Sequence, residues 1–187
     1  MQINDNLKEQ SKFAVELESK AIYLDLIHNE PVFLWKLSFS DVRLNRNKYE
    51  SYFGKTVIDE VLRCSGAMCF KDRINIRCGI IVNEDKFDIL DYDTSTFIIY
   101  HEIGHIVYKR FDSNKRKNFL NDIISDKYAK ACGYRITSNI FKLAKWEVNS
   151  LIPSLPSHST RFMTRILKMS LYVKHVVKAF IRKYLYL

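Results

Sequence analysis

Near the middle of the chain stands the run Thr96-Phe97-Ile98-Ile99-Tyr100-His101-Glu102-Ile103-Gly104-His105-Ile106-Val107-Tyr108. It contains the pattern H-E-x-x-H, formed by His101, Glu102 and His105. No proline interrupts the run, and the side chains of residues 93–96 offer oxygens that can cap the N-terminus of a helix. The apolar residues would bury such a helix on almost every side. The run therefore predicts a helix inside the core of the protein.

The two histidines are the first chemical signal. Residues four apart lie on one face of a helix, so His101 and His105 can bind one Zn²⁺ through ring nitrogens at about 2.0–2.1 Å. Glu102 can then take a proton from a water molecule that the metal activates. The alternative is a buried helix whose histidines are simply hydrogen-bonded, but burying such polar groups is costly. We therefore expect a zinc site with Glu102 as a catalytic residue.

Length and composition are those of one ordinary globular domain. The chain has 187 residues, of which 47% are hydrophobic and 27% charged, enough for a single core. The first ten residues lack the apolar segment of a signal peptide, no apolar run is long enough to span a membrane, and the four cysteines include no C-x-x-C pair. We expect a cytoplasmic protein with free thiols. Its single domain over 1–187 would comprise an N-terminal helix in 1–30, a catalytic core in 31–150, and a linker with a basic amphipathic helix in 151–187.

Hydrophobic patterns predict an α+β fold that is mostly helical, with a small sheet beside the H-E-x-x-H helix. Apolar residues at helical spacing predict a helix over 5–28, and residues 32–39 form either a strand or a short buried helix. The clearest strand is 73–83, which is rich in β-branched residues. It is either an ordinary sheet strand or the strand whose edge holds an extended substrate beside the metal helix. Further helices are predicted at 40–52, 56–63, 119–132, 137–150 and 161–187.

A third zinc ligand is expected because catalytic zinc usually has three protein ligands and one open position. Asp122 and Asp126 are four residues apart in the helix predicted after the H-E-x-x-H helix. If the two helices pack antiparallel, one carboxylate can bind the metal and the other can accept the remaining N–H of a ligating histidine. The alternative is a solvated acidic face beside Lys127 and Lys130. Glu147 is a second, weaker candidate for the third ligand.

This segment resembles two groups of zinc peptidases. H-E-x-G-H followed by N-E-x-x-A-D-x-Y-A is typical of the HtpX-like gluzincins, and E-x-x-A-[DN]-x-F-A is its counterpart in the ImmA/IrrE-like peptidases. This chain has Asn121-Asp122-x-x-Ser125-Asp126-x-Tyr128-Ala129. The resemblance implies a zincin-like fold, Zn²⁺ held by His101, His105 and Asp122, and Asp126 beside a ligating histidine. Because Asp122 is one methylene shorter than glutamate, its helix must lie closer to the metal.

A second, weaker likeness lies further along the chain. Ser157-His158-Ser159-Thr160 with Arg165-Ile166 resembles the HtpX-like motif S-T-H-P-x-x-x-x-R-I, without its proline and with one extra residue before the arginine. The resemblance implies that His158 or Arg165 lies by the site and stabilises the oxyanion of the reaction. Taken by itself, His158 is a loop residue. The likeness covers residues 93–133 well and 157–166 weakly.

The net charge of +9 belongs to the end of the chain. From Val148 to Leu187 there are seven Lys or Arg and no acid, whereas the other 147 residues hold 23 basic and 21 acidic side chains. Apolar residues recur every three or four positions from Phe162 to Leu187, with basic residues on another side. The helix can pack on the core with a solvated basic face, lie on an anionic membrane surface, or, as the least favoured choice, bind nucleic acid.

The sequence as a whole predicts a small cytoplasmic zinc metalloendopeptidase that acts on a protein or peptide, peripheral to the membrane if its tail binds lipid. The ImmA/IrrE likeness implies a narrower activity, in which one regulatory protein is cleaved and generic peptides are not. The alternative from another class is a non-catalytic basic binding module for a membrane surface or nucleic acid, with structural zinc or none. Metal content separates the two classes.

Overall fold

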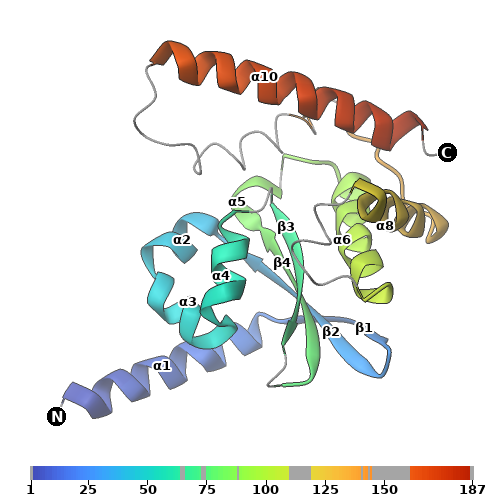
Figure 1. Ribbon diagram of the computed structural model, residues 1–187. Coiled ribbons are helices and arrows are strands. Elements are labelled where there is room, and N and C mark those ends of the chain that lie inside the picture. Colours follow the sequence, from blue (N-terminus) through green and yellow to red (C-terminus); the bar gives the residue numbers. More distant parts are fainter. Residues whose placement is uncertain are drawn as a thin grey trace.

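A computed structural model describes residues 2–63, 66–72, 75–87, 89–109, 119–139, 141–142, 144 and 161–185. This part of the chain is α+β, with a four-stranded mixed sheet covered by helices on both faces (Figure 1). The strands are β1 (Ile22–Ile27), β2 (Glu30–Leu37), β3 (Ala67–Asp72) and β4 (Arg77–Asn83). The helices are α1 (Gln2–Ser19), α2 (Phe39–Leu44), α3 (Arg46–Phe53), α4 (Lys55–Val61), α5 (Glu84–Phe87), α6 (Tyr92–Val107), α8 (Phe119–Ala131) and α10 (Arg161–Phe180), which continues into the π-helical turn η2 (Ile181–Leu185).

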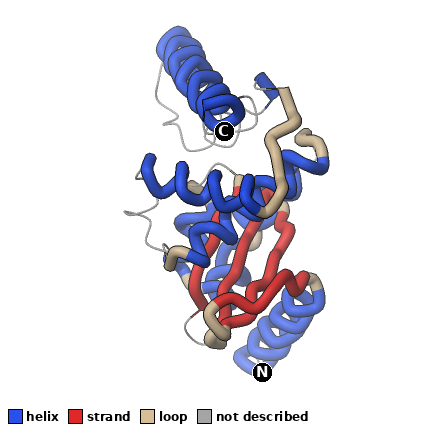
Figure 2. Tube along the Cα trace, turned by 90° about the vertical axis from the view of Figure 1, so that its right-hand side faces the viewer, coloured by secondary structure: helices blue, strands red, loops and turns tan. Residues whose placement is uncertain are grey.

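The sheet has the strand order β1-β2-β4-β3. β1 pairs with β2 and β3 with β4 in antiparallel fashion, whereas β2 and β4 run parallel. Figure 2 shows the strands of the sheet side by side. Successive side chains of a strand point to opposite faces, so the sheet supports two cores. Leu34 and Ile80 pack in the core that includes residues of α6, while Trp35 and Ile81 pack in the one that includes residues of α1 to α4. One face of the sheet therefore packs against α6.

The N-terminal helix is shorter than predicted. A helix over 5–28 is wrong beyond Ser19, because residues 22–27 form β1 and pair with β2. The chain reverses at His28 and Asn29, whose φ angles of 53° and 62° are those of a two-residue hairpin turn. Apolar residues at positions 21, 24 and 27 fit helical spacing, but pairing with β2 satisfies the backbone of this segment instead.

The predicted strand 73–83 also needs correction. Among its described residues, which begin at 75, Arg77–Asn83 form a strand, and another strand, Ala67–Asp72, that the sequence patterns did not reveal lies before it. β4 is paired on both sides, so it is not the edge strand. The edge strands are β1 and β3, and β3 packs against α6. The position that the prediction gave to 73–83, beside the metal helix, therefore belongs to β3.

Most other predicted elements are confirmed within a few residues. Residues 30–37 are a strand, 40–52 contains two short helices, and α4 and α8 match the predicted helices 56–63 and 119–132. Gly133 follows α8 with a φ of 92°, as expected of a residue that ends a helix. In the predicted helix 137–150, residues 137–139 are not helical and 145–150 lie outside the described residues. The three described cysteines, Cys69, Cys78 and Cys132, carry thiols rather than disulfides.

The C-terminal helix is present as predicted, but its exposed side is apolar and its inner side carries basic residues. Along its described side chains the apolar stripe is exposed, whereas His175 and Arg182 are turned inward and buried. The interpretation in which the stripe packs on the core and a basic face meets solvent is therefore wrong. Among the helices that the structure describes, none is both long and apolar enough to cross a membrane.

Candidate active site

Helix α6 is held firmly at both ends. Its N-cap is Asp91, whose carboxylate accepts the backbone N–H of Thr94 at 2.9 Å, rather than one of residues 93–96 as expected. Asp91 also accepts the hydroxyl of Thr137 at 2.6 Å, which joins α6 to the segment after α8. At the other end, Nε2 of His28 lies 2.8 Å from the carbonyl oxygen of Val107. These contacts fix the helix that carries the H-E-x-x-H pattern.

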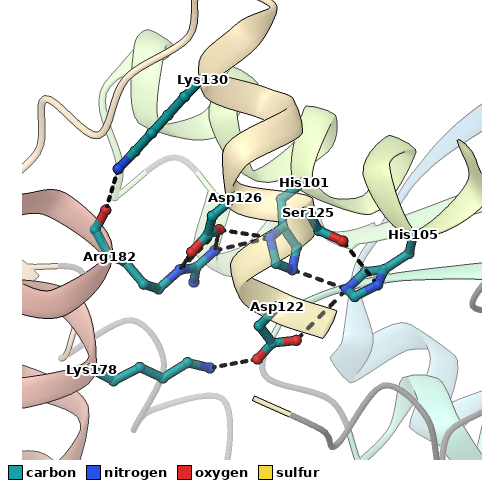
Figure 3. A network of polar contacts seen from close by, with 8 residues as sticks. All are labelled: His101, His105, Asp122, Ser125, Asp126, Lys130, Lys178 and Arg182. Carbon is teal, nitrogen blue, oxygen red and sulfur yellow. Dashed lines mark hydrogen bonds and ion pairs between the residues drawn. The ribbon is translucent and has the colours of Figure 1, made fainter. Parts of the chain in front are cut away.

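The two histidines of the pattern face each other in a buried position. Nε2 of His101 lies 3.1 Å from Nε2 of His105, and the two residues are 7% and 2% exposed (Figure 3). Two nitrogens that bind one tetrahedral Zn²⁺ lie about 3.3 Å apart, so the observed separation fits a shared ion. Ligand atoms of His101, Glu102 and His105 all lie within 4.8 Å of one another, the one such metal-like group in the described part of the chain.

Asp126 on α8 orients the first histidine. Its carboxylate accepts Nδ1–H of His101 at 2.7 Å, which leaves Nε2 of that ring with a lone pair directed toward His105. Burial disfavours the charged carboxylate, but the nearby Arg182 guanidinium and His101 imidazole outweigh it and hold the pKa of Asp126 below its usual range. The predicted role of Asp126 beside a ligating histidine therefore has the expected geometry.

The second histidine has a partner on α8 as well. Nδ1 of His105 shares a hydrogen bond of 3.1 Å with the hydroxyl of buried Ser125, where the related motifs have alanine. Oδ1 of Asp122 faces Nε2 of His105 from 3.8 Å, and Oδ2 of the same carboxylate lies 3.7 Å from Nζ of Lys178 on α10. Asp122 is thus directed at the histidine pair, while it also forms an ion pair with the C-terminal helix (Figure 3).

Helices α6 and α8 approach each other unusually closely. They run antiparallel, because His101 meets Asp126 and His105 meets Asp122. A Cβ atom placed on Gly104 would lie 2.9 Å from the backbone Cα of Ser125, a distance that real side chains do not tolerate. Glycine between Glu102 and His105 therefore allows the close approach that the short Asp122 side chain requires.

Glu102 lies at the edge of the sheet. Its carboxylate accepts the backbone N–H of Cys69 on β3 at 2.9 Å. Because the backbone groups of an edge strand point alternately toward its partner strand and toward the open edge, this N–H of Cys69 lies on the outer side of β3. The proposed base thus sits beside the outward-facing edge of β3.

The structure brings together five of the residues chosen from sequence: His101, Glu102, His105, Asp126 and, at the margin, Asp122. His158 and Glu147 lie outside the described residues. Arg165 belongs to α10, but its side chain is also outside them.

The sequence patterns did not indicate a role at the site for Arg182, Lys178 or Ser125. Arg182 donates to both oxygens of Asp126, and Lys178 pairs with Asp122. Two basic residues four apart, Lys178 on α10 and Arg182 on η2, therefore match two acids four apart on α8. The equal spacing of the two bases and of the two acids is visible in the sequence and is the pattern that indicates contact between these helices.

Comparison of the chain with protein-family models, with curated protein sequences and with solved structures found no match.

Proposed function

We propose that this chain is a zinc-dependent endopeptidase of zincin-like fold, related in plan to the HtpX-like and ImmA/IrrE-like peptidases. One observation carries the proposal: the two imidazole Nε2 atoms lie 3.1 Å apart in a buried position on one helix. A buried imidazole pair beside two carboxylates is costly unless it has a ligand or a catalytic purpose.

The donor set fits zinc. His101 and His105 would supply two nitrogens, and Asp122 would be the third ligand in exchange for its ion pair with Lys178. Each histidine has a hydrogen-bond partner on its other nitrogen, as metal-binding imidazoles almost always do. When bound, Zn²⁺ would act as a Lewis acid and make an attacking water molecule more acidic.

The protein's own groups would then perform the proton transfers and hold the geometry. Glu102 accepts the proton of the attacking water and passes it to the leaving amine. Asp126 fixes the tautomer of His101, and Ser125 holds the ring of His105. Arg182 keeps Asp126 ionised and in place. None of these residues needs to move far, because α6 and α8 are in direct contact.

The edge of β3 supports a peptide as the substrate. The edge groups of a strand can pair with an extended peptide, and Cys69 on this edge already donates to Glu102. A peptide aligned with β3 would therefore lie next to the carboxylate that accepts the proton.

Metal analysis tests the first half of the proposal. Purified protein should contain about one zinc per chain, and His101→Ala should lose it. A wild-type protein that binds no zinc would instead favour the non-catalytic binding module.

The Glu102→Gln variant tests the second half. Glutamine keeps an oxygen that can accept N–H of Cys69 but cannot take a proton, so this variant should retain zinc and lose cleavage. Products are compared by mass spectrometry for wild type and variant, on a mixture of peptides and on intact cellular proteins. Cleavage of one intact cellular protein, without cleavage of the peptides, would favour the ImmA/IrrE-like activity. Equal cleavage products from wild type and from Glu102→Gln would rule out the mechanism.

A further inference from the structure

An ordinary surface helix buries its apolar side, whereas the C-terminal helix exposes large apolar side chains and buries polar ones. Its inner side carries the polar groups: Arg182 binds Asp126, Lys178 binds Asp122, and Nζ of Lys183 donates to the carbonyl of Ser138. These contacts fix the rotation of the helix about its axis. Several large apolar residues are consequently turned away from the core, although Ala179 packs in it.

The outward side of this helix is an apolar stripe. Five large side chains recur along it at intervals of three or four residues, and each is about half exposed or more. Helix α10 lies along the outside of the molecule in both views (Figures 1 and 2), so the stripe is displayed on the surface. We call it the outer stripe: Met169 (72% exposed), Val173 (57%), Val177 (52%), Phe180 (46%) and Tyr184 (47%).

We propose that the outer stripe binds the surface of a lipid bilayer that contains anionic lipids. Helices that lie in the membrane interface bury an apolar face at the boundary of headgroups and acyl chains, and basic residues beside that face bind anionic headgroups. α10 and η2 contain seven Lys or Arg and no acid, and exposed Lys174 lies next to Val173 in the stripe. The apolar stripe and the exposed ammonium of Lys174 therefore lie on the outward part of one helix that carries no acid.

The side chains of this helix also argue against two other partners for the outer stripe, a second copy of the chain and nucleic acid. A second copy docked stripe to stripe would bring the exposed Lys174 of each chain toward a helix that carries no acid to pair with it. Nucleic acid needs several basic side chains on the contact face, whereas the exposed side of this helix is apolar and Lys178, Arg182 and Lys183 are engaged on the inner side. Binding to lipid does not depend on the peptidase activity, so this inference stands or falls separately.

Co-sedimentation with vesicles tests the inference on the full chain. Wild-type protein should sediment with vesicles of mixed phosphatidylcholine and phosphatidylglycerol, sediment less at high salt, and remain largely in solution with phosphatidylcholine alone. The double variant Val173→Gln/Val177→Gln should lower binding by about tenfold or more, because it removes apolar area without changing charge. Lys174→Gln should weaken binding in low salt only.

The matched control is the double variant Leu44→Gln/Tyr92→Gln, which replaces two exposed apolar residues outside α10 and should bind as wild type does. Circular dichroism and the melting temperature check that each variant is folded. If Val173→Gln/Val177→Gln does not fold, Met169→Gln takes its place. Wild type that stays in solution with anionic vesicles at low salt overturns the proposal, as does a folded stripe variant that binds unchanged. Concentration-dependent dimers in light scattering that the stripe variant abolishes would assign the stripe to a second copy instead.

Discussion

Arg182 binds both carboxylate oxygens of Asp126, with Nε 2.9 Å from Oδ2 and Nη2 2.7 Å from Oδ1. The two residues are 56 positions apart in sequence, and both are buried, at 7% and 1% exposure. Because Asp126 also accepts Nδ1–H of His101 at 2.7 Å, the guanidinium reaches the candidate metal centre through one carboxylate. The C-terminal helix is thereby a structural part of the candidate site.

Replacing Arg182 should weaken both the fold and the site. In Arg182→Met the buried carboxylate of Asp126 loses its cation, which should cost about 3–5 kcal/mol in the free energy of unfolding. His101 would lose the support that fixes its ring, so zinc affinity should fall by about 10–100-fold. Competition with a chromophoric chelator measures the affinity, and urea unfolding measures the stability.

Lys183→Met is the matched control for that variant. It also removes one positive charge from the same helix turn, but Lys183 binds the carbonyl oxygens of Thr137 and Ser138 and not Asp126. Equal zinc affinity in the two variants would mean that Arg182 does not act through His101.

Asp122 and Lys178 should affect zinc binding in opposite directions. Asp122→Ala should lower the affinity because it removes the proposed third ligand, whereas Asp122→Glu should retain binding. Lys178→Met should raise the affinity by up to about fivefold, since a partly exposed ion pair of this kind contributes little more than about 1 kcal/mol. Lys127→Met, at an exposed position of α8, controls for the loss of charge. Unchanged affinity in Asp122→Ala would exclude Asp122 as a ligand.

Gly104 should be intolerant of alanine in spite of its helical position. Alanine usually stabilises a helix interior by about 1 kcal/mol over glycine, but here its Cβ would meet the backbone of Ser125 at 2.9 Å. Separation of α6 from α8 should destabilise the protein by about 1–3 kcal/mol and lower its zinc affinity. Gly79→Ala, which would crowd the ring of Phe70 in the other core, should lower stability and leave zinc affinity unchanged. Stable Gly104→Ala protein with full affinity would contradict the close helix contact.

The elements that the sequence predicted well are those whose pattern is local. α6 and α8 have strong periodicity, and the spacings 101–105 and 122–126 place their polar groups on the correct faces. β1 was not predicted, because its apolar spacing also suits a helix and only the partner strand decides between the two. β3 became an edge strand through pairing with β4, which a local pattern cannot show.

The sequence predicted which polar residues of α6 and α8 come together, but not the contribution of the C-terminal helix. Arg182 is 81 residues from His101, so its contact depends on how α10 docks on α8. One of the three alternatives for the C-terminal helix makes its apolar stripe the buried face, as is usual for helices, and this would leave the basic residues in solvent. The ion pairs with Asp122 and Asp126 reverse that orientation. Ser125 looked like a neutral replacement of alanine, but its hydroxyl holds the ring of His105.

Asp91 should make the stability of the protein depend on pH in the acid range. Burial disfavours its charge, but hydrogen bonds from Ser138, Thr137 and Thr94 together outweigh that effect and hold the pKa of Asp91 well below its usual range. A lowered pKa in the folded state means that the stabilisation is fully present above the unfolded-state pKa of about 3.9. It is lost as the pH falls from there through the folded-state pKa.

The variant Asp91→Asn keeps a side chain that can cap α6 but carries no charge. Its free energy of unfolding should be lower than that of wild type by a constant amount from neutral pH to about pH 5, and the difference should shrink below about pH 4. Asp93→Asn removes an exposed acid from the same first turn and serves as the control. Urea unfolding at a series of pH values measures both differences. If the deficit of Asp91→Asn stayed constant down to the lowest pH at which wild type folds, or matched that of Asp93→Asn throughout, the charge of Asp91 would not be what fastens α6 to Thr137 and Ser138.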